Sequence, residues 1–171
     1  MPDIVVRGLS PARPQGKVQL GLLSISCALG RGGRRCKRGE GDGITPVGRW
    51  PMRHVFYRAD RIIRPRTSLS VSPLHPGLGW CDAPGDANYN RIVELPYAAS
   101  HECLWRRDHL YDVIIVLGHN DVPRSQGRGS AIFMHLARPD YQPTEGCIAV
   151  SLSHMMRILA QARPGDAVSV L

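Results

Sequence analysis

The chain has 171 residues, of which 43% are hydrophobic, and its net charge is +8. This length suits one domain with a sizeable core and is short for two, so we expect residues 1–171 to form a single domain. No apolar stretch approaches the roughly 20 residues that span a bilayer, which excludes a transmembrane segment from our expectations. The dense basic cluster at 30–43 has no aromatic residues for base stacking, so nucleic acid is not an expected partner.

Secondary structure in the first half of the chain is expected to be mostly extended. Residues 4–8 and 16–30 are rich in Val, Ile, Leu and Ser and punctuated by glycine, which predicts strands. A glycine-rich loop over 31–48 precedes another strand at 49–60. Prolines, glycines and Asx residues make 61–98 mostly irregular, and an irregular stretch of that length is usually a functional loop or lid.

The second half combines strands with one or two helices. Residues 100–112 are compatible with a short helix that has Ser100 as its N-cap. Residues 151–166 contain the clearest helix, with Ser153 as its cap and Pro164-Gly165 as its end. The apolar runs VIIVLGHN, SAIFMHLA and CIAVS, at 113–120, 130–137 and 147–151, predict buried strands, and AVSVL at 167–171 closes the chain as another.

The five cysteines form no CxxC pair, so a zinc or thioredoxin-type site is not expected. An odd number leaves at least one thiol unpaired. Cys147 follows a glycine and precedes a strand, and His135 lies twelve positions earlier (147 − 135 = 12). Two interpretations are open: Cys147 is an inert core residue, or it is a nucleophile that a histidine on the neighbouring strand activates.

The residues before Cys147 would serve the second interpretation, although a buried strand cysteine is more often inert and both interpretations stay open at this point. Gly146 permits a turn in which successive amides point into one concavity, a candidate oxyanion hole formed by the backbone of Glu145, Gly146 and Cys147. Thr144 is positioned to brace that turn through a bond from its side chain to the backbone.

At these residues the chain resembles the YkuD-type L,D-transpeptidase family, whose signature is a histidine followed by Ser/Thr-x-Gly-Cys. His135, Thr144, Gly146 and Cys147 occur in that order. Residues 39–50, GEGDGITPVGRW, resemble an upstream turn of the family. The resemblance covers about residues 17–171, and its most specific part lies in the last forty or so.

The resemblance implies a mostly β, sandwich-like catalytic domain with long loops that acts on peptidoglycan stem peptides. Cys147 would be the acylated nucleophile, His135 the general base and acid, and the backbone carbonyl of Leu136 the group that orients the histidine. The thioester would pass to an amine such as that of meso-diaminopimelate, with release of D-alanine. No metal or organic cofactor is implied, and carbapenem-type inhibitors are possible ligands. The alternatives are an L,D-carboxypeptidase or amidase that uses the same residues, or a non-catalytic wall-binding module.

The sequence departs from the family pattern close to the thiol. Ala149 stands where many members have Arg or Asn, and Glu145 where His is common. A substrate contact made by that arginine would have to come from elsewhere, for which Arg138 and Arg128 are candidates. The resemblance implies the periplasm or cell envelope, while the start of the chain shows no recognisable secretion signal, which leaves a cytoplasmic location open.

Other polar and aromatic residues near the central strand are candidates for substrate binding. His119 ends the run at 113–120. The stretch at 100–112 either forms a capped helix with Trp105 packed inside or walls the substrate cleft, and the loop at 80–90 poses the same choice. The residues of the first stretch that would contribute to a wall are His101, Trp105, Asp108, His109 and Tyr111.

Overall fold

The computed structural model describes residues 4–10 and 13–171. Residues 1–3 and 11–12 belong to the N-terminal stretch in which no secretion signal is recognised, and they lie outside the described residues. Strands in chain order are β1 (Ile4–Gly8), β2 (Gln15–Leu20), β3 (Leu23–Ala28), β4 (Arg34–Arg35), β5 (Thr45–Pro46), β6 (Gly48–Tyr57), β7 (Val71–Pro73), β8 (Leu78–Cys81), β9 (Arg91–Glu94), β10 (His101–Cys103), β11 (Val113–Leu117), β12 (Phe133–Leu136), β13 (Ile148–Val150) and β14 (Ala167–Val170). The helices are a 3-10 turn η1 (Pro139–Tyr141) and α1 (Leu152–Gln161).

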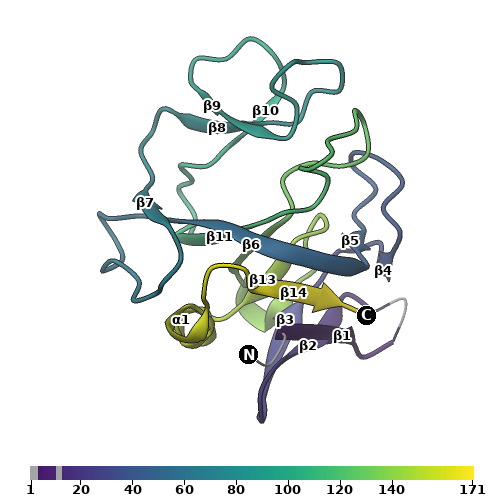
Figure 1. The fold of residues 1–171 in the computed structure, drawn as a ribbon, viewed down its shortest axis with the longest axis vertical. Coiled ribbons are helices and arrows are strands. Elements are labelled where there is room, and N and C mark those ends of the chain that lie inside the picture. Colours follow the sequence, from purple (N-terminus) through teal and green to yellow (C-terminus); the bar gives the residue numbers. More distant parts are fainter. Residues whose placement is uncertain (1–3, 11–12) are drawn as a thin grey trace.

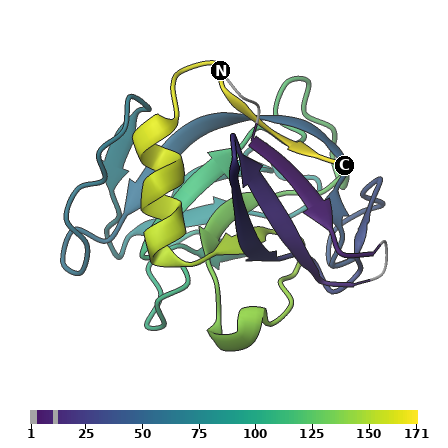
Figure 2. The same ribbon diagram turned by 90° about the horizontal axis from the view of Figure 1, so that it is seen from below.

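The main sheet closes on itself through the long strand β6. Its nine strands follow the order β11-β12-β13-β3-β2-β1-β14-β6-β7, and β6 also pairs with β11 (Figures 1 and 2). Along one edge, β6 pairs first with β14 and then with β7. Along its other edge, β6 pairs with β11. The expected mostly β, sandwich-like fold is therefore confirmed.

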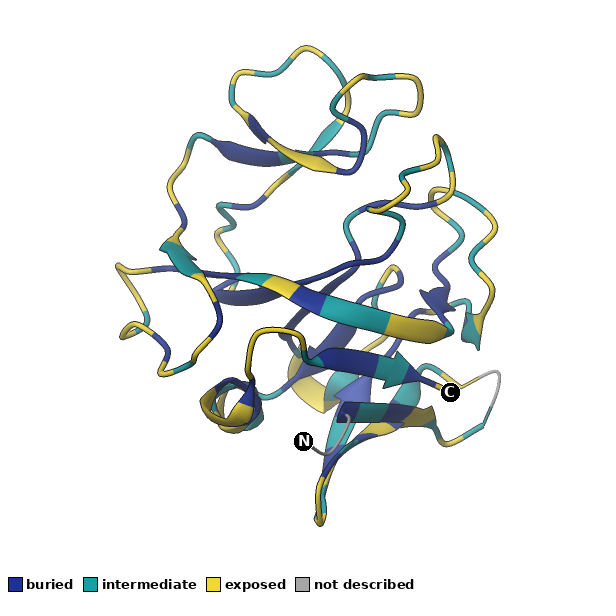
Figure 3. Ribbon diagram, viewed as in Figure 1, coloured by how far each residue is buried: buried dark blue, intermediate teal, exposed yellow. Residues whose placement is uncertain are grey.

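The predicted central strands are buried on both faces because they lie between two apolar clusters. In β11, Ile115 packs into the cluster enclosed by the main sheet and α1, whereas Ile114 faces a second cluster towards β8. The same alternation continues in β12, where Met134 belongs to the first cluster and Phe133 to the second. Residues that alternate along a strand point to opposite faces, so continuous apolar runs suit strands covered on both sides (Figure 3).

A three-stranded sheet, in the order β10-β8-β9, forms the upper part of the molecule in Figure 1. The prediction of a helix at 100–112 is wrong, because the start of this stretch is β10, which pairs antiparallel with β8. The prediction that 61–98 is mostly irregular missed β7, β8 and β9. Pairing between distant segments decides the conformation here, since hydrogen bonds to a partner strand outweigh a weak local helix preference.

The predicted C-terminal helix is present as α1, but its cap is Ser151 and not Ser153. The Ser151 hydroxyl accepts a hydrogen bond from the His154 amide at 3.4 Å. Met155, Ile158 and Leu159 are the buried residues of its apolar face. Within the part of the chain that the structure describes, no helix has both the length and the apolarity to cross a bilayer.

Candidate active site

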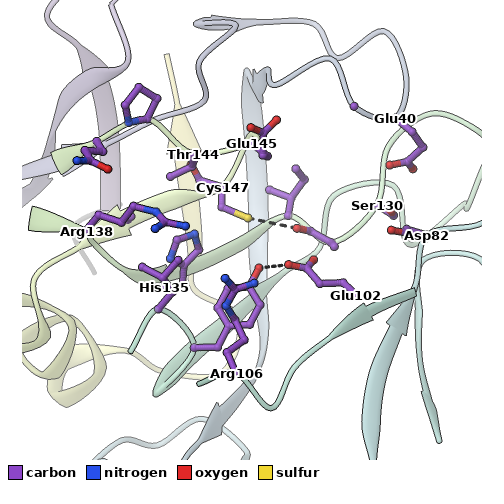
Figure 4. Close-up of a pocket in the computed structure, with 18 of the residues that line it drawn as sticks. Glu40, Asp82, Glu102, Arg106, Ser130, His135, Arg138, Thr144, Glu145 and Cys147 are labelled. Atoms are coloured by element: carbon purple, nitrogen blue, oxygen red, sulfur yellow. Dashed lines mark hydrogen bonds between the residues drawn. The ribbon is translucent and has the colours of Figure 1, made fainter. Parts of the chain in front are cut away.

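A cleft of about 340 Å³ opens beside the start of β13, and the side chains of Cys147 and His135 both line it (Figure 4). Parallel pairing of β12 and β13 brings the two residues to the same cleft, with His135 opposite Ala149, two positions after Cys147. Residues two apart on a strand share a face, so Cys147 and Ala149 point to the side on which His135 lies. Ala149 also lines the cleft, and its methyl group leaves room beside the imidazole.

The Cys147 thiol is held by main-chain groups. It is only 8% exposed, donates to the Ala131 carbonyl at 3.3 Å and accepts from the Phe133 amide at 3.4 Å. Burial, together with the nearby charge of Glu102, raises the pKa of the thiol to about 12, against the lowering effects of the Phe133 amide and the Lys37 charge. The sulfur is therefore a neutral thiol at rest, and forming a thiolate requires a base.

His135 is buried and has one ring nitrogen fixed by the backbone. Nδ1 lies 2.9 Å from the Leu136 carbonyl oxygen, and because a carbonyl only accepts, Nδ1 carries the proton and Nε2 keeps its lone pair. Burial, together with the charges of Arg106 and Arg138, lowers the pKa of His135 to about 4, although the hydrogen bond to the Leu136 carbonyl opposes this shift. The imidazole is thus neutral at neutral pH, in the form able to accept a proton.

The turn before Cys147 is built around Gly146. This glycine has φ of 131°, and a β-carbon on it would lie 2.7 Å from the Ile44 carbonyl oxygen. Thr144 braces the turn, since its Oγ1 donates to the Cys147 carbonyl at 2.6 Å and accepts from the Gly146 amide at 3.2 Å. The Gly146 amide, which we expected in the oxyanion hole, is thus directed at Thr144 in this structure, and only Glu145 and Cys147 remain as the sequence-based candidates.

The upstream segment that resembles the family turn packs against this same glycine turn. Thr45 lies in β5, is fully buried, and its Oγ1 accepts from the Gly30 amide at 2.7 Å. Gly30 in turn forms a parallel bridge with Thr144. The two motifs that are far apart in the sequence therefore meet behind the thiol.

Substituting Gly146 by alanine is expected to lower the free energy of unfolding by about 2–4 kcal/mol, because strain at positive φ adds to the clash with Ile44. Gly165→Ala is the matched control, since Gly165 has φ of 93° with open space around its β-carbon position. Urea unfolding of both variants separates the two contributions. Equal losses in the two proteins would contradict a role for the Ile44 contact.

Charged side chains of both signs line the cleft. In Figure 4, Glu40 and Asp82 lie on one side and Arg138 lies on the other with His135, while Glu102 and Arg106 lie between them. Lys37 and Glu145 line the cleft as well. Such an arrangement complements a ligand that carries both an ammonium and a carboxylate group.

Tyr111 and Glu102 form a hydrogen-bonded pair that lines the cleft together with Cys147. The Tyr111 hydroxyl donates to a carboxylate oxygen of Glu102, and its ring meets the His135 imidazole edge-on at 5.3 Å between centroids. Burial raises the pKa of Glu102, while the Tyr111 hydrogen bond and the Arg106 charge oppose that shift. Tyr111 therefore lines the cleft, as expected of a substrate-binding candidate, and also packs against the proposed base.

Of the sequence-based candidates, Arg138 and Thr144 belong to the cleft lining, whereas His101, Asp108, His109 and the three residues described next do not. Trp105 stacks under the Arg58 guanidinium at 3.5 Å. Arg128 is an exposed loop residue that does not contribute to the lining. His119 is buried against Trp50, with ring centroids 4.8 Å apart. A direct substrate contact for these three therefore has no support from the cleft geometry.

The stability of the fold is expected to fall as pH falls from 6.5 towards 4. Burial lowers the pKa of both His119 and His135 from 6.5 to about 4, so the unfolded chain binds more protons than the folded chain in this window. The two neutral histidines contribute their full stabilisation above pH 6.5. This contribution is lost as pH falls through their pKa of about 4 in the folded protein. Urea unfolding at pH 7.5, 6 and 5 measures this loss.

His119→Phe separates the contribution of one histidine from the other. Nδ1 of His119 is buried without a hydrogen-bond partner, so phenylalanine removes an unpaired polar atom as well as a titrating group. The loss of unfolding free energy between pH 7.5 and 5 is expected to be smaller in this variant. An unchanged loss would show that His119 does not contribute.

Sequence reasoning missed most of the charged residues that line the cleft. Glu40, Asp82, Glu102 and Arg106 come from three separate segments and follow no local spacing rule. The stretch at 100–112 was proposed as a possible wall, and it is one, but through Glu102, Arg106 and Leu110 together with Tyr111. Polar residues shortly before the predicted central strand at 113–120 are the signal that could have identified Glu102 and Arg106.

Comparison with known proteins supports the resemblance seen in the sequence. The chain matches the YkuD family, the L,D-transpeptidase catalytic domain, over residues 15–170. No curated protein and no solved structure matches the chain significantly.

Proposed function

Because this chain belongs to the YkuD family of L,D-transpeptidase catalytic domains, we propose that it is a cysteine-dependent L,D-transpeptidase of peptidoglycan stem peptides. The observation that carries this proposal is the placement of the Cys147 thiol and the His135 imidazole in one cleft, with His135 Nδ1 tied to the Leu136 carbonyl. That bond leaves Nε2 as the proton acceptor and keeps the ring in place.

Acylation begins when the thiol turns from the Ala131 carbonyl towards His135. His135 Nε2 takes the proton as the sulfur attacks the carbonyl carbon of the residue before the terminal D-alanine. The S–C bond forms, the C–N bond breaks, and the D-alanine amine leaves with the proton from the imidazolium. Backbone amides of Glu145 and Cys147 are the candidates to stabilise the oxyanion.

Transfer follows when an amine attacks the thioester and gives up a proton to His135. The C–N bond forms, the C–S bond breaks, and the sulfur recovers a proton from the imidazolium. The presence of both acidic and basic groups in the cleft supports this assignment, because a diaminopimelate side chain carries both an ammonium and a carboxylate. Arg106 and Arg138 are the candidates for the carboxylate, in place of the basic residue that many members have at position 149, and Glu40, Asp82 and Glu102 are the candidates for the ammonium.

The proposal is tested by incubating the purified protein with diaminopimelate-containing tetrapeptides and analysing the products by mass spectrometry. The expected product is a cross-linked dimer that has lost one D-alanine. If a tripeptide is the only product, the protein acts as a carboxypeptidase that hydrolyses the thioester and not as a transpeptidase. Unchanged tetrapeptide, with no adduct formed by a carbapenem, would overturn the catalytic proposal in favour of a binding module.

A further inference from the structure

The orientation of the nucleophile depends on a residue from outside the strands that carry it. Both hydrogen-bond partners of the Cys147 sulfur, the Ala131 carbonyl and the Phe133 amide, belong to the chain that enters β12. Phe133 is fixed because it is part of β12 and pairs with Val116 of β11. Ala131 precedes the strand, so its position must be set in another way.

Ala131 adopts a backbone conformation that alanine disfavours. Its φ is 51°, in the left-handed region, which costs a residue with a β-carbon of the order of 1 kcal/mol or more. The surrounding structure must hold this conformation. The orientation of the Ala131 carbonyl, and with it that of the thiol proton, follows from whatever holds it.

The Asn90 side chain supplies that restraint. Its Oδ1 accepts from the Ala131 amide at 3.1 Å and from Trp80 Nε1 at 3.0 Å. Its Nδ2 donates to the carbonyls of His119 at 3.0 Å and Asn120 at 2.9 Å. All four hydrogen-bonding positions of the amide are used, and Asn90 is buried.

Asn90 joins two parts of the fold at the nucleophile. It ends the loop between β8 and β9, and its own amide donates to the Cys81 carbonyl at 2.8 Å. Its side chain reaches both ends of the loop between β11 and β12, since His119 and Asn120 begin that loop and Ala131 lies near its end. The small three-stranded sheet is thereby coupled to the loop that presents the Ala131 carbonyl to the thiol.

We infer that Asn90 is a positioning residue for the nucleophile, whose side-chain amide fixes the Ala131 carbonyl against the Cys147 thiol; this inference rests on the proposed role of Cys147. Asn90 does not line the cleft, so it acts through Ala131 and not on the substrate. Its amide holds the thiol proton on a main-chain acceptor until the sulfur turns to His135.

Asn90→Gly is the sharpest test, because glycine accepts the φ of 55° at this position and removes only the side chain. Release of the Ala131 carbonyl removes the acceptor that stabilises the protonated thiol. The measured pKa of Cys147, from the pH dependence of its alkylation by iodoacetamide, is expected to fall by about one unit, a roughly tenfold faster alkylation below that pKa. Turnover of tetrapeptide is expected to fall by about tenfold to a hundredfold, because the nucleophile is less well placed.

Tyr89→Phe is the matched control for general loosening of the loop. The Tyr89 hydroxyl accepts from the Gly129 amide at 2.9 Å, two residues before Ala131, and comes from the residue next to Asn90. This variant loosens the same loop, removes the hydrogen bond that the Tyr89 hydroxyl donates to Glu40, and leaves the bond between Asn90 and Ala131 in place. Its alkylation profile is expected to stay within about twofold of the wild type at every pH, a difference of under a third of a pKa unit.

Asn90→Asp keeps an oxygen for the Ala131 amide and loses the donors to His119 and Asn120. It is expected to lower the melting temperature without faster alkylation, because the retained oxygen still accepts from the Ala131 amide and the added negative charge disfavours a thiolate. This variant separates stability from positioning and carries the test should Asn90→Gly not fold. The groups facing the thiol are unchanged in all three variants; they are Glu102 of β10, Tyr111 before β11, His135 of β12 and Lys37 between β4 and β5.

The inference is overturned by an Asn90→Gly profile that superimposes on the wild type, by an equal shift in Tyr89→Phe, or by faster alkylation in Asn90→Asp. Alkylation needs no substrate, so these outcomes are independent of whether the tetrapeptide is turned over. A shift in alkylation without any tetrapeptide turnover in the wild type would leave the positioning of the thiol supported and remove the proposed reaction.

Discussion

Cys147→Ser is expected to lower turnover of the tetrapeptide by at least about a thousandfold and to abolish the covalent adduct with a carbapenem. A hydroxyl has a far higher pKa than a thiol, and the neutral imidazole of His135, with a pKa of about 4, is a weak base for it. The side chain changes little in size, so the fold should be retained. Release of D-alanine and intact-protein mass spectrometry measure the two effects.

Cys36→Ser is the control for this experiment, because Cys36 is an exposed free thiol outside the cleft lining. It is expected to retain both turnover and the adduct. An adduct that persists in Cys147→Ser and disappears in Cys36→Ser would show that Cys36, and not Cys147, is the reactive thiol.

His135→Gln is expected to lower the rate of acylation by about a hundredfold to ten-thousandfold at neutral pH, because glutamine cannot accept the thiol proton. The pH profile should change as well. In the wild type, activity needs the neutral imidazole, so it is present above the His135 pKa of about 4 and is lost as pH falls through that value. In the variant, the rate should instead rise about tenfold per pH unit, because only the fraction of Cys147 that is ionised reacts.

His109→Gln is the control for the loss of a histidine outside the cleft lining, since the His109 side chain is 80% exposed and pairs with Asp112. It should keep the wild-type profile. An acid limit near pH 6.5 in the wild type, or a flat profile in His135→Gln, would contradict the assignment of His135 as the base.

The strands that carry the site were predictable from the sequence because their burial is continuous. VIIVL and FMHL are apolar on both faces, and every residue of β11 and β12 is buried. The glycine turn before Cys147 was predictable for a similar reason, since Gly146 provides a φ that other residues avoid. In both cases the local sequence and the final environment require the same residue type.

The small sheet and the wall of the cleft were not predictable in the same way. The segment His101–Cys103 does not show the alternation of apolar and polar residues that predicts a strand. It is extended because it pairs with β8. Ser151 and Ser153 are equally good caps from the sequence alone, and the hydrogen bond to the His154 amide distinguishes them. Asn90 shows the same limit, because its four partners lie 10 to 41 positions away.

Cys147 lies where the two apolar clusters share a boundary only one strand thick. A change of side-chain volume at Ile148, inside the enclosed cluster, would be transmitted through the backbone of β13 to the residue next to it, which is Cys147. Substitutions that raise heat resistance by changing the volume around Ile148 are therefore expected to displace the proposed nucleophile as well. Exposed positions of β1 and β2, such as Arg7 and Lys17, lie outside that cluster and offer a safer route for an engineer.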